Sequence, residues 1–230
     1  GSAYGALSRD ELRRSLDLVA SVRAAVGPST DLFIEAHDRF YPATAIEVGR
    51  SLSEFDIGWL EAPVLTTDLE SLGRVAAAVP VPVAAGERIR NLDQFAGLLK
   101  QPVAVAQPEI LSLGGLWPTI KAASLAEAAK VAVAPHNAQS PFMTVVNMHF
   151  AAAVSNFMVL ECFDLFLDSW ASELLSGLAI FGEGSLSTRD GPGFGVEIDE
   201  SVASQHPYDN HNFLRLFRPG WEWRNRDHHE

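Results

Sequence analysis

Six ionisable residues stand at the ends of short apolar runs that recur along much of the chain. They are Glu35, Glu61, Glu87, Glu109, His136 and Glu161. Hard carboxylate oxygens suit Mg2+, which keeps its remaining positions for water and substrate oxygens. A neutral imidazole can accept a proton near neutral pH, and a carboxylate behind it stabilises the imidazolium that forms. These residue types therefore indicate a divalent-cation site with an imidazole that could exchange a proton beside it, provided that the fold brings them into one cavity.

The apolar runs before these residues have the composition of buried strands. We predict strands at 32–35, 58–61, 81–85, 103–107, 131–134 and 157–161. We predict helices between them at 10–25, 41–52, 69–78, 91–99, 117–129 and 141–155, with Asn91 as an N-cap. Strands that alternate with helices in this way indicate βα units and a parallel sheet covered on both faces.

A (β/α) barrel of the TIM type explains this pattern better than a Rossmann fold does. A Rossmann fold needs a glycine-rich phosphate turn after a strand. The only adjacent glycines in such a place are Gly114 and Gly115, without a GxGxxG motif. In a parallel barrel the loops after the strands form the active-site face. The six ionisable residues would then share one rim, where their mutual repulsion calls for a cation.

Composition narrows the classes of partner. The chain has 230 residues and a formal net charge of −12. So acidic a surface repels nucleic acid and anionic membranes, and we expect neither as a partner. No apolar run is long enough to predict a membrane span. Cys162 is the only cysteine, which excludes an internal disulfide and suits a reducing compartment, so we expect a cytoplasmic protein.

Several short motifs follow one another in a specific order. They are Trp-Leu-Glu-Ala-Pro at 59–63, Ala-Ala-Gly-Glu-Arg at 84–88, Gln-Pro-Glu at 107–109, Leu-Gly-Gly at 113–115 and Ala-Pro-His-Asn at 134–137. A glycine-rich segment at 191–198 follows them. This ordered set resembles the mandelate racemase branch of the enolase superfamily, and the resemblance extends over residues 32–199.

The resemblance implies a magnesium site. It assigns Glu35, Glu61 and Glu87 as the metal ligands, and the sequence contains no CxxC or HExxH motif that would favour zinc. Two residues depart from the family pattern. The first metal ligand is usually Asp where this chain has Glu35, and the partner of the basic histidine is usually Asp where it has Glu109.

The resemblance also implies roles in proton transfer. His136 would be the general base, oriented by Glu109, and Glu161 would contact the carboxylate end of the intermediate. His37 matches the general acid of galactonate-type sugar-acid dehydratases. Alternation along a strand would place His37 on the same face as Glu35.

These roles imply dehydration of an acid sugar to a 2-keto-3-deoxy acid, with a small sugar acid as substrate and Mg2+ as cofactor. An epimerase, racemase or cycloisomerase of the same superfamily is an alternative, because it would share the base and the metal. A non-catalytic protein that keeps the barrel is a second alternative. By the same resemblance we expect a symmetric homo-oligomer.

The resemblance finally predicts the domain organisation. Residues 1–177 would form the barrel domain and cover about strands three to eight of it, whereas the capping domain and the first strands are not in this sequence. Residues 178–230 would form a C-terminal segment that packs on the barrel or capping region, with Trp221 and Trp223 in its tail.

Overall fold

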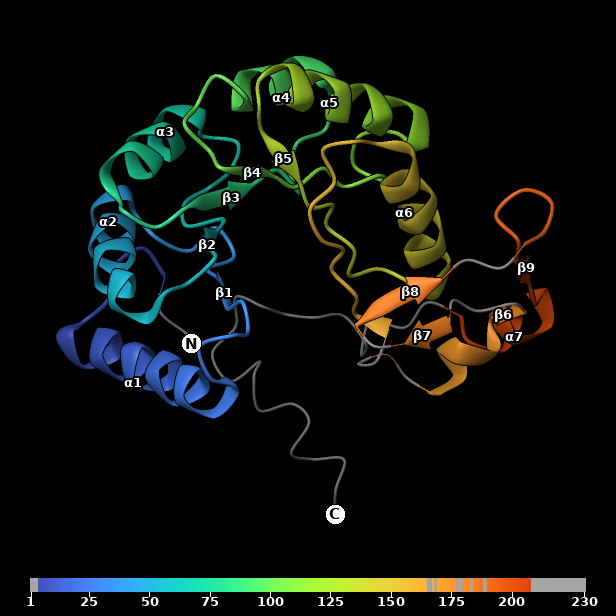
Figure 1. Cartoon of the computed structure of the whole chain (residues 1–230), viewed down its shortest axis with the longest axis horizontal. Helices are drawn as coiled ribbons and strands as arrows, with labels where there is room; N and C mark the ends of the chain where they lie inside the picture. Colours follow the sequence, from blue (N-terminus) through green and yellow to red (C-terminus); the bar gives the residue numbers. More distant parts are fainter. Residues whose placement is uncertain are drawn as a thin grey trace.

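The computed structural model describes residues 4–164, 167, 169–176, 180–182, 184–187 and 190–207. Six helices form an outer arc, and five short strands lie on its inner side (Figure 1). The remaining strands and the last described helix lie together beyond one end of this arc (Figure 1).

The central sheet is parallel throughout, with the order β1-β2-β3-β4-β5. Its strands are β1 (Phe33–Glu35), β2 (Trp59–Glu61), β3 (Val83–Ala85), β4 (Val105–Ala106) and β5 (Ala132–Val133). The register sets Glu35 opposite Glu61, so two of the predicted strand-end carboxylates are direct neighbours. The parallel sheet predicted from the sequence is confirmed.

The sixth predicted strand, at 157–161, is reduced to one bridge between Val133 and Phe157. Val133 N donates to Asn156 O at 2.8 Å, and Met158 N donates to Val133 O at 2.8 Å. The next donor on that strand would be residue 135, which is proline and has no N–H. The prediction of a regular strand there is therefore wrong, although the segment does lie along β5.

The helices of the arc begin and end close to their predicted bounds. They are α1 (Arg9–Val26), α2 (Pro42–Ser51), α3 (Leu69–Ala78), α4 (Leu92–Leu98), α5 (Leu116–Ala128) and α6 (Pro141–Ala153), with a 3-10 turn η1 (Leu52–Phe55) after α2. Ser8 and Glu11 form a reciprocal capping box at the start of α1. Asn91 accepts a hydrogen bond from Gln94 N at 2.9 Å, which confirms it as an N-cap.

The sheet separates two apolar regions. Residues such as Val83 and Val133 point outward and pack under the helices, where Phe95 and Phe150 are fully buried. The inner face carries a smaller cluster of Trp59, Ala84, Val105 and Ala134, with Phe33 stacked on Trp59 at 3.6 Å between ring centroids. Because side chains alternate along a strand, this cluster lies below the strand-end carboxylates Glu35 and Glu61.

The segment after residue 164 has a different architecture. It contains η3 (Ser169–Glu173), β6 (Leu175–Ser176), β7 (Ile180–Gly182), β8 (Ser185–Ser187), β9 (Glu197–Ile198) and α7 (Glu200–Gln205). β6 pairs with β9, so the domain boundary predicted at residue 177 falls between two paired strands. Phe194 packs edge-on against Phe142 of α6 at 5.8 Å between centroids.

The predicted tail with Trp221 and Trp223 lies outside the described residues. Among those described, no helix has the length and apolar character needed to cross a membrane.

Candidate active site

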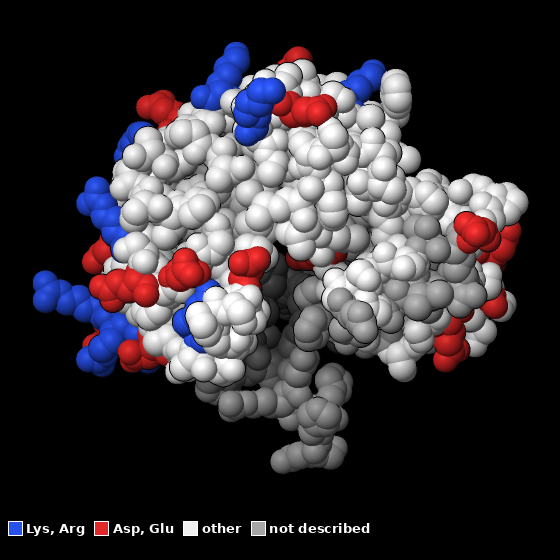
Figure 2. All heavy atoms as spheres, viewed as in Figure 1, with Lys and Arg blue, Asp and Glu red and all other residues white. Residues whose placement is uncertain are grey.

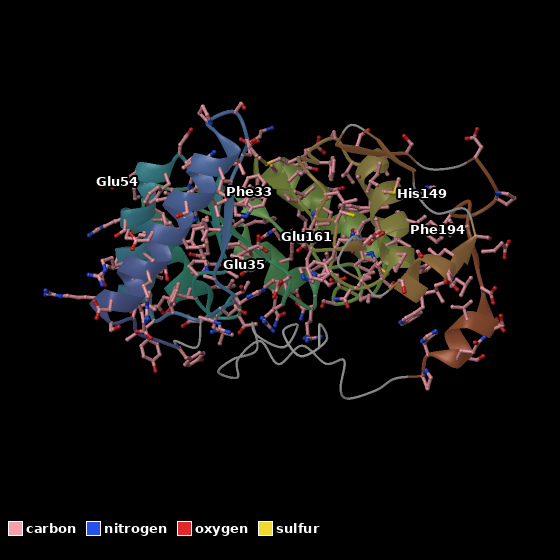
Figure 3. The ribbon with its side chains drawn as sticks, turned by 90° about the horizontal axis from the view of Figure 1, so that it is seen from below. Phe33, Glu35, Glu54, His149, Glu161 and Phe194 are labelled. Atoms are coloured by element: carbon pink, nitrogen blue, oxygen red, sulfur yellow. The ribbon has the colours of Figure 1, made fainter. Side chains whose placement is uncertain are left out.

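One cavity of about 560 Å³ collects every ionisable residue that the sequence singled out. Its lining includes Glu35, His37, Glu61, Glu87, Glu109, His136 and Glu161. Figure 3 shows Glu35 and Glu161 in the middle of the molecule, between the two sides of the helical arc. In Figure 2, carboxylate side chains border the central hollow, whereas most Lys and Arg side chains lie on the outer helices. The register of the strand ends therefore produces one shared cavity.

Gly86 brings the end of β3 into this cavity. Its φ is +147°, and a Cβ there would lie 2.9 Å from both the backbone N and O of Gln107. Only a glycine allows the backbones after β3 and β4 to approach so closely. The next residue, Glu87, is consequently directed at the cavity from the strand end.

Glu35 and Glu61 are register partners at the ends of β1 and β2, and each carboxyl group raises the cost of a second charge beside it. Burial, followed by the neighbouring charge of Glu61, raises the pKa of Glu35 to about 10. Glu61 also accepts a hydrogen bond from Trp59 Nε1 at 3.0 Å, and Glu35 accepts one from His37 N. The two carboxyl groups are thus held side by side, in an environment that opposes the ionisation of Glu35.

Glu87 completes a set of three oxygen donors that fits a hard divalent cation. Burial raises its pKa as well, although His136 and Arg88 counteract that effect. Within the part of the chain that the structure describes, no three His, Cys, Asp or Glu side chains already converge on one point. Each of the three carboxylates instead lies against other groups of the protein. Glu35 lies beside Glu61, and Glu87 pairs with His136 and Arg88.

His136 and Glu109 form a tight dyad. Nδ1 of His136 lies 2.5 Å from Oε2 of Glu109, while Oε1 of Glu109 accepts a hydrogen bond from Leu111 N at 3.0 Å. Burial alone would raise the pKa of Glu109, but the hydrogen bond from His136 and that from Leu111 outweigh it and lower the pKa. The Glu109 carboxylate therefore remains charged behind the imidazole, and the longer side chain still reaches it.

The other imidazole nitrogen faces the cavity. Nε2 of His136 lies 3.3 Å from Oε2 of Glu87. Burial alone would lower the pKa of His136, but the hydrogen bond to Glu109 and the charges of Glu87 and Glu161 raise it to about 9. Both ring nitrogens of His136 thus face a carboxylate, an arrangement that favours the imidazolium form.

Asn137 fixes the position of Glu161. Its backbone N donates to Oε2 of Glu161 at 2.8 Å, and its Nδ2 donates to the backbone O of Glu161 at 2.9 Å and to Thr144 Oγ1 at 2.9 Å. Asn147 Nδ2 donates to Asn137 Oδ1 at 3.1 Å. These buried amides connect α6 to the carboxylate. The motif at 134–137 contained Asn137, but spacing alone gave no sign of this network.

His37 reaches the cavity by a route that the sequence did not predict. β1 ends at Glu35, and His37 and Asp38 both have left-handed backbone, with φ of +52° and +58°. The prediction of strand alternation at His37 is therefore wrong, because the chain turns after Ala36. Burial and the charge of Arg39 lower the pKa of His37.

Comparisons with known proteins agree with this geometry. Residues 5–202 match the family model described as enolase C-terminal domain-like. The chain is 30% identical to the D-gluconate dehydratase of Thermoproteus tenax, in a match that covers 90% of the chain and 42% of that protein. It is 29% identical to the D-gluconate/D-galactonate dehydratase of Picrophilus torridus, over 95% of the chain and 56% of the relative.

A solved structure shows the same fold. The mandelate racemase/muconate lactonizing enzyme-like protein from Rubrobacter xylanophilus aligns with a TM-score of 0.84 at 33% identity, over 90% of this chain and 53% of that one. The chain spans about half the length of the curated relatives that it matches. The parallel sheet, its helical cover and this match confirm the predicted barrel architecture. The chain therefore belongs to the enolase C-terminal domain-like family.

Proposed function

We propose that this chain forms the catalytic half of a Mg2+-dependent lyase that dehydrates a sugar acid to a 2-keto-3-deoxy acid. The observation that carries the proposal is the position of His136. Its Nδ1 is bound to Glu109 at 2.5 Å, and its Nε2 faces Glu87 at 3.3 Å in the same cavity as Glu35 and Glu61. The names of the dehydratase relatives support this reaction class.

The donor set suits Mg2+ chemically, and Glu35, Glu61 and Glu87 would hold the ion. When bound, Mg2+ would act as a Lewis acid that stabilises the negative charge developing on the substrate carboxylate. The raised pKa values of Glu35 and Glu87 support this assignment, because clustered buried carboxylates that resist ionisation are stabilised by a divalent cation.

His136 would remove the proton next to the carboxylate. Its Nε2 is the nitrogen that faces the cavity, whereas Glu109 holds Nδ1 and stabilises the imidazolium. The base must first be neutral, and the raised pKa of His136 reflects in part the charge of Glu87. Once that carboxylate is neutralised by another partner, the imidazolium loses part of its stabilisation and Nε2 becomes able to accept a proton.

His37 would protonate the departing β-hydroxyl group. Burial and the charge of Arg39 lower the pKa of His37, and an additional negative charge close to the imidazole would favour its protonated form. The carboxylate of a bound sugar acid supplies such a charge. Glu161, fixed by Asn137, would contact the carboxylate end of the intermediate.

A screen of aldonates and aldarates with Mg2+, with detection of 2-keto products, tests the proposal on the protein at its full natural length. Glu87→Gln should abolish dehydration, whereas Glu47→Gln on the outer face of α2 should leave it unchanged. Undiminished dehydration by the Glu87 variant would remove the metal-ligand role. Exchange of solvent deuterium into the carbon next to the carboxylate, with the hydroxyl retained, would instead assign an epimerase or racemase.

A further inference from the structure

Asp38 is a buried acid that connects three loops of the candidate site. It is 7% exposed and follows β1. Its Oδ1 accepts hydrogen bonds from Thr66 N at 3.0 Å and from Thr66 Oγ1 at 2.8 Å, in the loop after β2. Its Oδ2 pairs with Nε of Arg88, in the loop after β3. Asp38 therefore joins the loops that follow three successive strands.

Arg88 is the cation for which two carboxylates compete. The same Nε that pairs with Asp38 also lies 3.4 Å from Oε1 of Glu87. The Asp38 contact is the shorter of the two, and its carboxylate is the more buried, with 5% of the side chain exposed against 15% for Glu87. The Asp38 contact is a hydrogen bond, whereas the Glu87 contact is only an ion pair, so Asp38 is the principal partner of the Arg88 Nε.

The backbone conformation of Asp38 indicates that its contacts with Thr66 and Arg88 hold the turn after β1 in place. Asp38 and His37 are consecutive non-glycine residues with positive φ, a conformation that costs free energy at each position. Such strain persists only where the surroundings determine the conformation. At Asp38 it is compensated by the two hydrogen bonds from Thr66, by the pairing with Arg88 and by the hydrogen bond from Asp38 N to Ala62 O at 2.7 Å.

We propose that Asp38 is a positioning residue that binds the Arg88 guanidinium, prevents it from pairing fully with Glu87 and so keeps the Glu87 carboxylate available to a divalent cation. Without Asp38, the nearest carboxylate for Arg88 is Glu87, and an arginine bound there would compete with the cation for the same oxygens. This inference rests on the proposed function, since it assumes that Glu87 is a metal ligand.

The inference is tested by calorimetric titration with Mg2+ alone. The titration compares the Mg2+ affinity of four proteins, each at the full natural length. They are the parent, Asp38→Asn, Arg88→Gln and the double variant. Asp38→Asn keeps an oxygen for Thr66 but loses the charge that holds Arg88. Because Arg88 would then make with Glu87 the charge-assisted hydrogen bond that it now makes with Asp38, we expect Mg2+ affinity to fall at least about tenfold.

The double variant separates this mechanism from a simple loss of negative charge. In the Arg88→Gln background, Asp38→Asn should change Mg2+ affinity by no more than about twofold, because no guanidinium is left to redirect. An equal loss of affinity in both backgrounds would overturn the inference. Arg88→Met replaces Arg88→Gln if the latter does not fold. Asp68→Asn is the matched control, because Asp68 also accepts a backbone amide, from Ser71 N at 3.1 Å, but outside the cavity.

A crystal structure of Asp38→Asn without metal provides a readout that is independent of Mg2+ and of activity. Arg88 should move from the 3.4 Å contact of the parent into direct hydrogen-bond distance of Glu87, and an Arg88 that keeps its place or turns to solvent would refute the inference. A parent protein that fails to bind Mg2+ would count against the proposed function, and this crystal structure would still decide the role of Asp38.

Discussion

Replacing Glu109 by glutamine tests the electrostatic origin of the proposed base. The substitution keeps the shape of the side chain, which is 4% exposed, but removes the charge behind Nδ1 of His136. In the parent protein the environment raises the pKa of His136 from 6.5 to about 9. This difference corresponds to about 3 kcal/mol in favour of the imidazolium.

Glu109 makes the strongest of the interactions that raise this pKa, ahead of the charges of Glu87 and Glu161. We therefore expect the pKa of His136 in Glu109→Gln to fall below about 7.5. The raised pKa in the parent contributes stability that is fully present below pH 6.5 and is lost as the pH rises through about 9. Glu109→Gln should remove most of this dependence, which amounts to about 1.4 kcal/mol per pH unit for one proton.

The assay is an NMR titration of the imidazole Cε1–H signals in Mg2+-free protein, with His136→Gln used to assign the resonance. Urea unfolding at pH 6.5 and pH 9 measures the linked stability. Glu47→Gln, on the outer face of α2, serves as the charge-matched control. A parent His136 that titrates near 6.5, or a pKa that Glu109→Gln leaves unchanged, would refute the reasoning. The same variant should lower kcat by on the order of a hundredfold or more, because it weakens general base catalysis.

Three further substitutions address other parts of the structure. The pKa of Glu35 is about 10 in the folded protein against 4.5 ordinarily, so metal-free protein should lose stability as pH rises from 4.5 through 10. Glu35→Gln should flatten that loss in urea unfolding curves. Gly86→Ala should cost more than about 1 kcal/mol and weaken Mg2+ binding in calorimetry, since its Cβ meets the backbone of Gln107, whereas Gly182→Ala has free space around its Cβ. Phe95→Ala, at 0% exposure, should lower the free energy of unfolding by about 3 to 5 kcal/mol in urea titrations.

The sequence predicted the cavity because parallel strands align their carboxyl ends. Residues such as Glu61 and His136 end separate apolar runs, and the sheet places those ends at one rim. The helices were also predictable, since local caps such as Asn91 and amphipathic spacing define them. These features depend on local pattern, which a single sequence displays directly.

The contacts between loops could not be predicted in the same way. The left-handed turn at His37 and Asp38 depends on partners at Thr66 and Arg88, which lie far away in the sequence. The shortened sixth strand is an intermediate case. Pro135 was visible in the sequence, but its effect on the ladder required knowledge of which backbone groups would face it.

Contacts between loops also explain why Glu35, Glu61 and Glu87, the three candidate ligands, do not converge on one point in the structure. Each carboxylate has another partner in the structure, since Glu35 lies beside Glu61 and Glu87 contacts His136 and Arg88. If the proposed Mg2+ site is correct, a divalent ion would have to displace these partners in order to bind. Its binding would then be coupled to proton release and to the protonation of His136, and it would weaken the contact with Glu87 that favours the imidazolium.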